Sequence, residues 1–328
     1  MTRSKRTRTV ALAGGAGLLC AVLVAVLLLA PGGGAARPTP CVYSGGTLDG
    51  LQKFDATIGR QIKCAMVFDD AAPDWSAWEY PWFVYNRSAN ENWTQFARRP
   101  GDTMIITLNL FPSSVDNANW RAIGAAGGYV AYDKTLARNL VAAGMGHAII
   151  RLAHEANGTW YADNVGTTPA QWAQWKEFWR RTAIAMRSVP GAHFSFNWCI
   201  AAGNRPIPFS AYYPGNDVVN SIGVDVYDSG VPRGVTDRWA YQYDRPGGVG
   251  AIAGFAREQH KPLSVPEWGL QPTSADGIGS DPAFTRSLVA MMRSQHVSFQ
   301  SYFFTEGGET ALLGDPASLR IYRTELLP

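Results

Sequence analysis

Histidine, cysteine and charged residues are scarce in this chain of 328 residues, which has five His and four Cys and is 17% charged. No two His residues stand at the spacing of a zinc-binding helix. The sequence therefore argues against metal catalysis, and we expect neither a metal nor another cofactor. Hydrophobic residues, by contrast, make up 46% of the chain and Trp numbers 12, which is typical of a well-packed globular protein.

The chain also has no excess of positive charge once the first few residues are set aside. The formal charge of the whole chain is +3, and Arg3, Lys5, Arg6 and Arg8 supply four positive charges, so the remainder carries 3 − 4 = −1. A chain with this balance offers no basic surface for phosphate groups. We therefore expect no nucleic-acid partner.

An apolar run at residues 10–30 follows these basic residues, and small residues at 31–36 follow the run. This order is typical of an export segment. The run is longer than a signal-peptide core of about 7 to 15 residues, so residues 1–36 are interpreted as either a cleaved signal peptide or a membrane anchor. The protein is thus predicted to be secreted or anchored at the outer face of the cell membrane. We expect a monomer, which touches the membrane only through this segment and only if the segment is not cleaved.

Three cysteines lie outside the apolar run, which contains Cys20. Cys41 and Cys64 are the expected disulfide pair, since an exported domain folds in an oxidising compartment. Cys199, within Phe-Asn-Trp-Cys, is interpreted as a buried thiol.

The length and rhythm of the chain favour a single (β/α)8 barrel, the TIM-barrel form of the α/β class. Such a barrel takes about 250 residues, and short apolar runs alternate here with longer helical patterns. Residues 37–60 are assigned to a linker or N-terminal extension and residues 61–328 to the barrel. Strands are predicted at 62–68, 82–85, 104–110, 148–153, 193–198, 221–226, 262–265 and 297–303, and helices at 132–143, 169–187, 249–259 and 282–295.

Two glutamates stand at the ends of the predicted fourth and seventh strands. Chemistry on this fold collects at the C-terminal ends of the strands. The fourth strand leads into Arg-Leu-Ala-His-Glu-Ala-Asn-Gly-Thr-Trp-Tyr at 151–161, which contains Glu155, and the seventh into Pro-Glu-Trp-Gly at 266–269, which contains Glu267. Hydrolysis of a glycosidic bond by double displacement needs an acid and a nucleophilic carboxylate about 5 to 5.5 Å apart. The pair therefore indicates a retaining glycoside hydrolase.

These two segments resemble glycoside hydrolase family 26. The likeness rests on Arg-x-x-His-Glu-x-Asn-Gly-x-Trp-Tyr at 151–161 and on Pro-Glu-Trp-Gly at 266–269. The family consists mainly of endo-β-1,4-mannanases, which are retaining barrel enzymes with catalytic glutamates on strands four and seven. The resemblance implies that Glu155 is the acid/base and Glu267 the nucleophile.

The resemblance also implies that Arg151 and His154 support the glutamates and that Tyr227, in Gly-Val-Asp-Val-Tyr, reaches the nucleophile. The charge of Arg151 would favour the ionised form of Glu267, and Glu155, facing that negative charge, would keep its proton. The residues expected to bind substrate or to support the pair are Arg151, His154, Asn157, Trp160, Tyr161, Trp198, Tyr227 and Trp268.

Aromatic residues gather in two further places. Trp172, Trp175 and Trp179 recur at helical spacing, which predicts packing of that helix on the barrel. The segment 74–119 is rich in Trp, Pro and Asn, and an alternative to a strand at 82–85 is a set of loops at the barrel mouth. Its rings suit either core filling or stacking under sugar rings; they are Trp75, Trp78, Tyr80, Trp82 and Trp93.

The sequence thus predicts an exported, retaining endo-β-glycanase that acts on a polysaccharide, with β-1,4-mannan as the first expected substrate. Two alternatives stay open. One is hydrolysis of another β-glycan, such as a glucan, a xylan or a cell-envelope glycan. The other is a barrel that binds glycan without cleaving it, against which the intact pair of glutamates argues.

Overall fold

The computed structural model describes residues 37–69, 72–115, 118–203, 205, 207–273, 276–304 and 314–327. The predicted export segment at 1–36 lies outside the described residues. Among the helices of the described part, none has both the length and the apolar character needed to cross a membrane.

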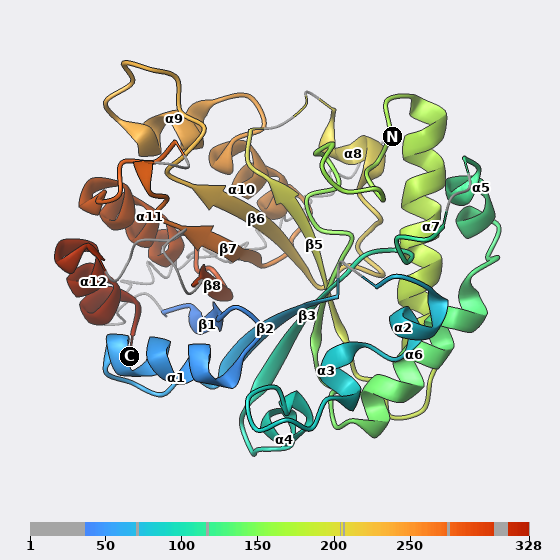
Figure 1. The fold of residues 1–328 in the computed structure, drawn as a ribbon. Helices are drawn as coiled ribbons and strands as arrows, with labels where there is room; N and C mark the ends of the chain where they lie inside the picture. The colour runs from blue at the N-terminus through green and yellow to red at the C-terminus, as the bar shows by residue number, and fades with distance from the viewer. Residues whose placement is uncertain are drawn as a thin grey trace, which may run out of the picture. The chain divides into compact units, whose positions relative to one another are not determined.

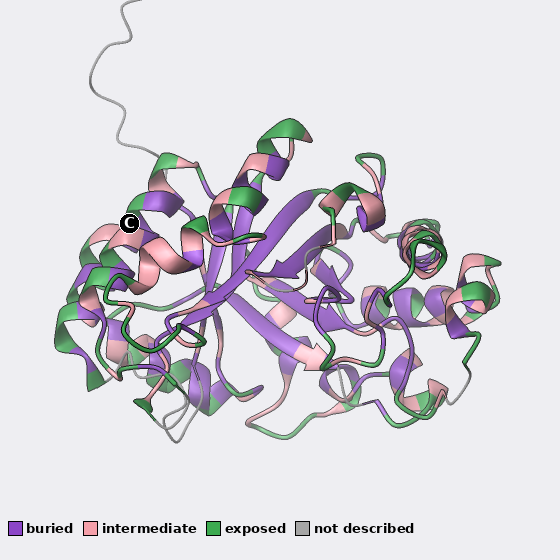
Figure 2. Ribbon diagram, turned by 90° about the horizontal axis from the view of Figure 1, so that it is seen from above, coloured by how far each residue is buried: buried purple, intermediate pink, exposed green. Residues whose placement is uncertain are grey.

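Eight parallel strands close into a barrel in chain order, and the eighth pairs with the first. This confirms the predicted (β/α)8 fold. The strands lie at the centre and the helices surround them (Figure 1), and the strands are almost entirely buried (Figure 2). The strands are β1 (Thr39–Tyr43), β2 (Cys64–Asp69), β3 (Thr103–Leu108), β4 (Ile149–Leu152), β5 (Ser195–Ala201), β6 (Ser221–Tyr227), β7 (Leu263–Gly269) and β8 (Phe299–Phe303).

Helices follow the strands and cover the outside of the barrel. The four predicted helices are present as α6, α7, α10 and α11, with ends that differ by at most two residues from the prediction. The described helices are α1 (Leu48–Ile58), α2 (Trp75–Glu79), α3 (Trp82–Tyr85), α4 (Trp93–Ala97), α5 (Trp120–Ala125), α6 (Val130–Ala142), α7 (Pro169–Arg187), α8 (Phe209–Tyr212), α9 (Arg238–Asp244), α10 (Val249–Glu258), α11 (Pro282–Ser294), α12 (Pro316–Ile321) and the π-helix η3 (Tyr322–Leu326).

The longest of these helices, α7, is anchored at the end of β4. Thr168 begins the helix with a capping box, and a proline follows in the first turn. Trp175 and Trp179 are fully buried, which confirms the predicted packing role of this aromatic stripe. The indole of Trp179 donates to the carbonyl of Leu152 at 3.0 Å, so the helix holds the strand end that precedes Glu155.

Two predicted elements were wrong. The segment 82–85 is the helix α3 and not a strand, and the first barrel strand is β1, within the stretch predicted to be a linker or extension. The barrel domain therefore begins at Thr39. One predicted strand is absent and one strand that was not predicted is present before β3, so the numbering of the later strands does not change. The strand that precedes Glu155 is still the fourth, and the strand that carries Glu267 is still the seventh.

Both errors have a physical cause. The apolar, aromatic run at 82–85 has the composition of a strand, but it follows Pro81 and is too short to be decided by propensity alone. It buries Phe83 and Val84 in the core and leaves Trp82 half-buried. β1 contains Pro40, a residue that argues against a strand inside a sheet, so the sequence did not predict it. The strand nevertheless pairs with β8 along its whole length.

The interior of the barrel changes from apolar at one end to polar at the other. Cys41 and Cys64 form a disulfide between β1 and β2, as predicted, and they pack inside the barrel with Met66, Ile105 and Phe299. Successive residues of a strand alternate between the interior and the helix layer. Towards the C-terminal ends of the strands, the interior positions are therefore taken by the polar residues of the candidate site.

Candidate active site

The two predicted glutamates meet at the C-terminal end of the barrel. Glu267 lies on β7, and Glu155 lies in the turn after β4, which is separated from β7 by two strands, β5 and β6. One carboxylate oxygen from each, together with one from Asp225 on β6, lies within 4.8 Å of the others. The structure therefore brings together side chains that are 112 positions apart in the sequence (267 − 155 = 112).

The backbone around Glu155 is unusual. Ala153 and Glu155 both adopt left-handed φ angles, of 48° and 50°, which side chains other than glycine rarely take. The amide of Glu155 donates to the carbonyl of Cys199 on β5 at 3.1 Å. This tight turn directs the Glu155 side chain towards the carboxylates of β6 and β7.

A buried arginine lies among the three carboxyl groups. The Arg151 guanidinium donates to Glu267 at 2.9 Å and forms a second ion pair with Asp225. It also contacts the Thr107 hydroxyl at 3.5 Å and the Cys199 thiol at 3.8 Å. Because these partners come from β3, β5, β6 and β7, the guanidinium lies inside the barrel. A fully buried cation is tolerated only when it is paired in this way.

Asp225 is the member of this cluster that the sequence did not single out. It stands two residues before Tyr227 on the same strand, so alternation places both side chains in the interior. That spacing was the available signal. Burial raises the pKa of Asp225 well above its usual range, although Arg151 opposes the shift.

The environment of Glu155 favours its protonated form. Burial and the neighbouring charge of Glu267 raise the pKa of Glu155 to about 7, against the opposing effect of Arg151. The indole of Trp160 donates to the Glu155 carboxyl at 2.7 Å, and this Trp is 56% exposed. Trp160 therefore lies where a substrate entering from solvent would meet both the ring and the carboxyl group.

Glu267, in contrast, is held by two donors. Besides Arg151, the Tyr227 hydroxyl donates to it at 2.7 Å, as the resemblance implied. Burial, with the negative charge of Glu267, raises the pKa of Tyr227 well above its usual range. Tyr227 therefore keeps its proton and stays a donor.

His154 and Tyr161 form a packed pair beside the cluster. Their ring centroids are 4.3 Å apart, and the Phe68 ring meets His154 edge-on at 5.6 Å. Burial, reinforced by the charge of Arg151, lowers the pKa of His154 well below its usual range. His154 is therefore neutral and adds no second positive charge to the site.

Three residues predicted to bind substrate face away from the opening. The Asn157 amide is buried and bonds in both directions to the main chain of Ala201. Trp198 is 1% exposed and packs against Tyr213 and Phe255, and Trp268 is 0% exposed. Trp198 precedes Cys199 and Trp268 follows Glu267, and both of these neighbours point into the barrel. Because side chains alternate along a strand, the two Trp rings point to the helix layer. The prediction of sugar contacts for these three residues was wrong.

The loop after β4 is clamped by a residue that the sequence did not single out. Arg205 donates to the carbonyls of Asn157 and Gly158, each at 2.9 Å, and to that of Gly166 at 3.0 Å. Hydrogen bonds from a charged donor are stronger than neutral ones. Arg205 thus fixes the loop that carries Glu155 and Trp160.

The three carboxyl groups are also the one set of residues in the described part of the chain that is close enough to hold a metal ion. The Arg151 guanidinium, however, already contacts Asp225 and Glu267 from within the barrel. The chain itself therefore supplies the positive charge that a metal ion would bring.

Comparisons with known proteins give a family match and a shared fold. Residues 134–240 match the model of glycosyl hydrolase family 26. No curated protein matches the chain. Among solved structures, the Bacillus subtilis mannanase man26 is similar with a TM-score of 0.62 and 12% identity over 88% of this chain and 85% of that one.

Two further solved structures share the fold. An endo-β-1,4-mannanase from Cellulomonas fimi has a TM-score of 0.60 and 18% identity, over 88% of this chain and 70% of that one. A family 26 β-mannanase from Bacteroides ovatus has a TM-score of 0.61 and 11% identity, over 89% and 90%. At such identities these likenesses establish the common barrel.

The barrel, the carboxyl groups at its C-terminal end and the family match define the chain as a glycoside hydrolase. The resemblance to family 26 that the sequence predicted is confirmed. A polysaccharide is the substrate class that this family implies.

Replacement of Arg205 by Met should loosen the loop at 155–166. Three carbonyls lose a charged donor, and each such bond contributes about 1.5–3 kcal/mol. Amide hydrogen exchange across the loop should therefore rise at least about tenfold, as measured by mass spectrometry of its peptides. Arg180→Met, which removes an exposed ion pair with Asp217, serves as the control. Unchanged exchange in the loop would show that Arg205 does not hold it.

Proposed function

We propose that this protein is an exported, retaining endo-β-glycanase that cleaves β-1,4-mannan, with Glu155 as acid/base and Glu267 as nucleophile. The observation that carries the mechanism is the distance between the two side chains, whose nearest oxygens lie within 4.8 Å. Retaining enzymes place their carboxyl groups about 5–5.5 Å apart, whereas inverting enzymes leave about 6.5–9.5 Å for a water molecule. The short separation supports direct attack by a carboxylate.

In the first step, Glu155 donates its proton to the glycosidic oxygen while Glu267 attacks the anomeric carbon. The glycosidic bond breaks, and a glycosyl ester forms on Glu267. Arg151 and Tyr227 hold Glu267 from two sides, so its attacking oxygen is aimed before substrate arrives.

In the second step, Glu155 acts as a base. Formation of the ester removes the negative charge of Glu267, which is one of the two causes that raise the pKa of Glu155. Glu155, which gave its proton to the leaving group in the first step, therefore remains a carboxylate more easily and accepts a proton from water. The water oxygen attacks the anomeric carbon, the ester bond to Glu267 breaks, and the sugar leaves with its configuration retained.

The substrate and the compartment rest on further observations. The solved structures that share the fold include mannanases from Bacillus subtilis and Cellulomonas fimi. The basic and apolar residues at 1–36 have the order of an export segment, and the disulfide between Cys41 and Cys64 suits an oxidising compartment.

The purified protein should cleave β-1,4-mannan internally in preference to β-1,4-glucan or β-1,4-xylan. Product masses should show a range of oligosaccharides from the earliest times, and proton NMR should show the β-anomer as the first product. An α-anomer at first would contradict retention. Preferential cleavage of glucan or xylan would move the proposed substrate to that glycan.

Replacement of Glu267 by Ala should abolish turnover, lowering kcat by at least about 10⁴-fold, because no nucleophile remains. Added azide should restore part of the activity by entering the vacated space and attacking the anomeric carbon, which gives an α-glycosyl azide. Glu258→Ala, at an exposed position on α10, should behave like the wild type. Near wild-type rates for Glu267→Ala would rule out this nucleophile.

The pH profile should report Glu155. Because its pKa lies at about 7 and the acid form is needed, kcat/KM on mannan should be high below pH 7 and fall as pH rises above it.

In Glu155→Ala, turnover of mannan should fall far more than the glycosylation rate with a 2,4-dinitrophenyl glycoside, whose leaving group needs no proton. Equal losses on both substrates would contradict the acid role.

A further inference from the structure

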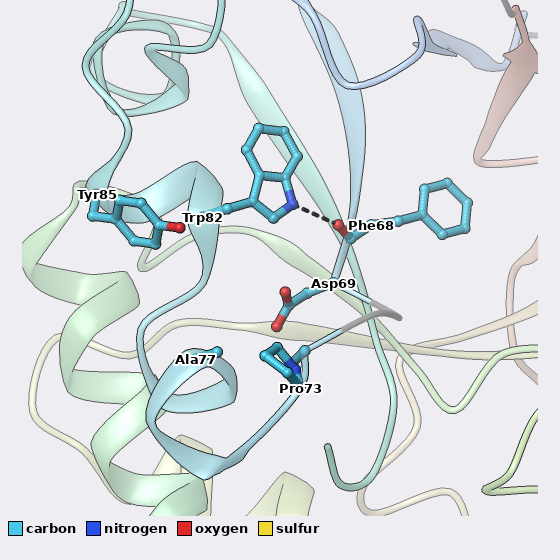
Figure 3. Close-up of a pocket in the computed structure, with 7 residues that line it drawn as sticks. Phe68, Asp69, Pro73, Ala77, Trp82 and Tyr85 are labelled. Carbon is cyan, nitrogen blue, oxygen red and sulfur yellow. Dashed lines mark hydrogen bonds between the residues drawn. The ribbon is translucent and has the colours of Figure 1, made fainter. Parts of the chain in front are cut away.

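Opposite charges gather at the two ends of the barrel. Carboxyl groups collect where the strands end, with Asp225 on β6, Glu267 on β7 and Asp69 at the end of β2 (Figure 3). The other end, which we call the basal face, consists of the turns that lead into the strands, and all of these turns belong to the described residues. They are residues 37–38, 59–63, 98–102, 143–148, 188–194, 213–220, 259–262 and 295–298.

The basal face is positively charged. It contains six basic and two acidic residues, which gives a formal charge of 6 − 2 = +4. Both acidic residues have basic partners: Asp217 is bound by Arg180 of α7 at 2.7 Å, and Asp102 interacts electrostatically with Arg99 and Lys63. The basic residues are Arg37, Arg60, Lys63, Arg98, Arg99 and Lys261, all of them exposed except Lys261.

The net charge of the chain gave no sign of this face. Residues 37–328 carry −1 in total, so the part of them outside the basal face carries −1 − 4 = −5. The expectation that the chain offers no basic surface was therefore wrong for the basal face, because a net charge does not show how the charges are distributed.

Most of the positive charge lies in one sector of the basal face. Five of its six basic residues precede β1, β2 and β3, which are neighbours in the barrel. A cavity of about 220 Å³ lies in this sector, and Gln61, Lys63 and Thr103 contribute polar groups to its walls. An ammonium group beside hydrogen-bonding side chains suits a phosphate group, which Lys binds as a point charge.

Exposed histidines lie in four other turns of the basal face. Four of the five His of the chain are found there, namely His147, His193, His260 and His296. The rings of His147 and His193 stack, with their centroids 4.8 Å apart. Because a neutral imidazole keeps one N–H donor, these side chains offer hydrogen bonds to anionic oxygens around the rest of the face.

The chain enters the barrel at the basal face. Arg37 is the first described residue, and only residues 31–36 separate it from the apolar run that ends at residue 30. An extended chain of that length spans at most about 25 Å. A barrel that is still attached to an inserted run therefore has the basal face close to the membrane.

We propose that the basal face docks on a membrane that contains anionic phospholipids, whose phosphate groups lie against the turns before β1, β2 and β3. Each positive side chain near such a surface raises binding about fivefold. Docking at this end turns the carboxyl groups of the active site away from the membrane. The inference goes beyond the proposed function: it uses the proposed export and does not depend on glycan hydrolysis.

The protein to test is residues 37–328, because they contain all eight strands and lie within one compact unit. In co-sedimentation, this protein should bind phosphatidylcholine vesicles that contain about one third phosphatidylglycerol, and about 0.5 M salt should release it. Vesicles of phosphatidylcholine alone should not bind it, because they carry no net charge.

Lys63→Gln combined with Arg99→Gln should weaken binding to the anionic vesicles about 25-fold, since two charges leave the basal face. The matched control combines Lys134→Gln on α6 with Arg233→Gln after β6. It removes the same net charge away from the basal face and should change binding by less than about threefold. Equal losses in the two double variants would overturn the proposal, because they would indicate a general effect of net charge.

Three further results would also overturn it. They are no binding to the anionic vesicles, equal binding to the neutral vesicles, and tighter binding to polyphosphate in solution than to the anionic vesicles. The last result would indicate that the basal face binds a charged polymer. Absence of glycan cleavage together with intact vesicle binding would remove the proposed function and support the docking surface.

Discussion

The active site depends on one buried positive charge. The Arg151 guanidinium is completely inaccessible to water and forms ion pairs with Glu267 and Asp225. An unpaired charge in that position would destabilise the barrel severely, and unpaired carboxylates would repel one another. The arginine therefore allows the acidic groups to be buried together. It also determines their arrangement, because its planar guanidinium group forms hydrogen bonds with two of them in fixed directions.

The same charge is shared unequally by the two glutamates, which lie a few ångströms apart. One cation faces three carboxyl groups, so they cannot all be ionised at neutral pH without net negative charge in the barrel. Glu267 receives hydrogen bonds from both Arg151 and Tyr227, whereas Glu155 receives one from an exposed indole. Burial and the neighbouring charge of Glu267 favour the protonated form of Glu155. A retaining glycosidase needs this difference before substrate binds.

The barrel and its rim have separate tasks. The strands carry Asp225 and Glu267. The turn at Glu155, with its left-handed backbone, is held by a main-chain hydrogen bond to Cys199 on β5 and by the hydrogen bonds from Arg205. The segment between β2 and β3 contributes no residue to the charged cluster. It forms the short helices α2, α3 and α4, and a cavity lies between α2, α3 and the end of β2. The charged cluster is therefore built at the strand ends, and the segments between the strands vary around it.

The sequence by itself determined the barrel, the long helices, the disulfide and the pair Glu155 and Glu267, because periodicity, strand ends and local motifs are properties of short stretches of chain. The tertiary structure alone decided that residues 82–85 form a helix and that 39–43 form a strand, since partners distant in sequence override local preference there. It also decided that Trp198 and Trp268 face the helices and that Asp225 and Arg205 serve the site. Which face of a strand a side chain occupies, and which charges it meets, depends on the closure of the whole barrel.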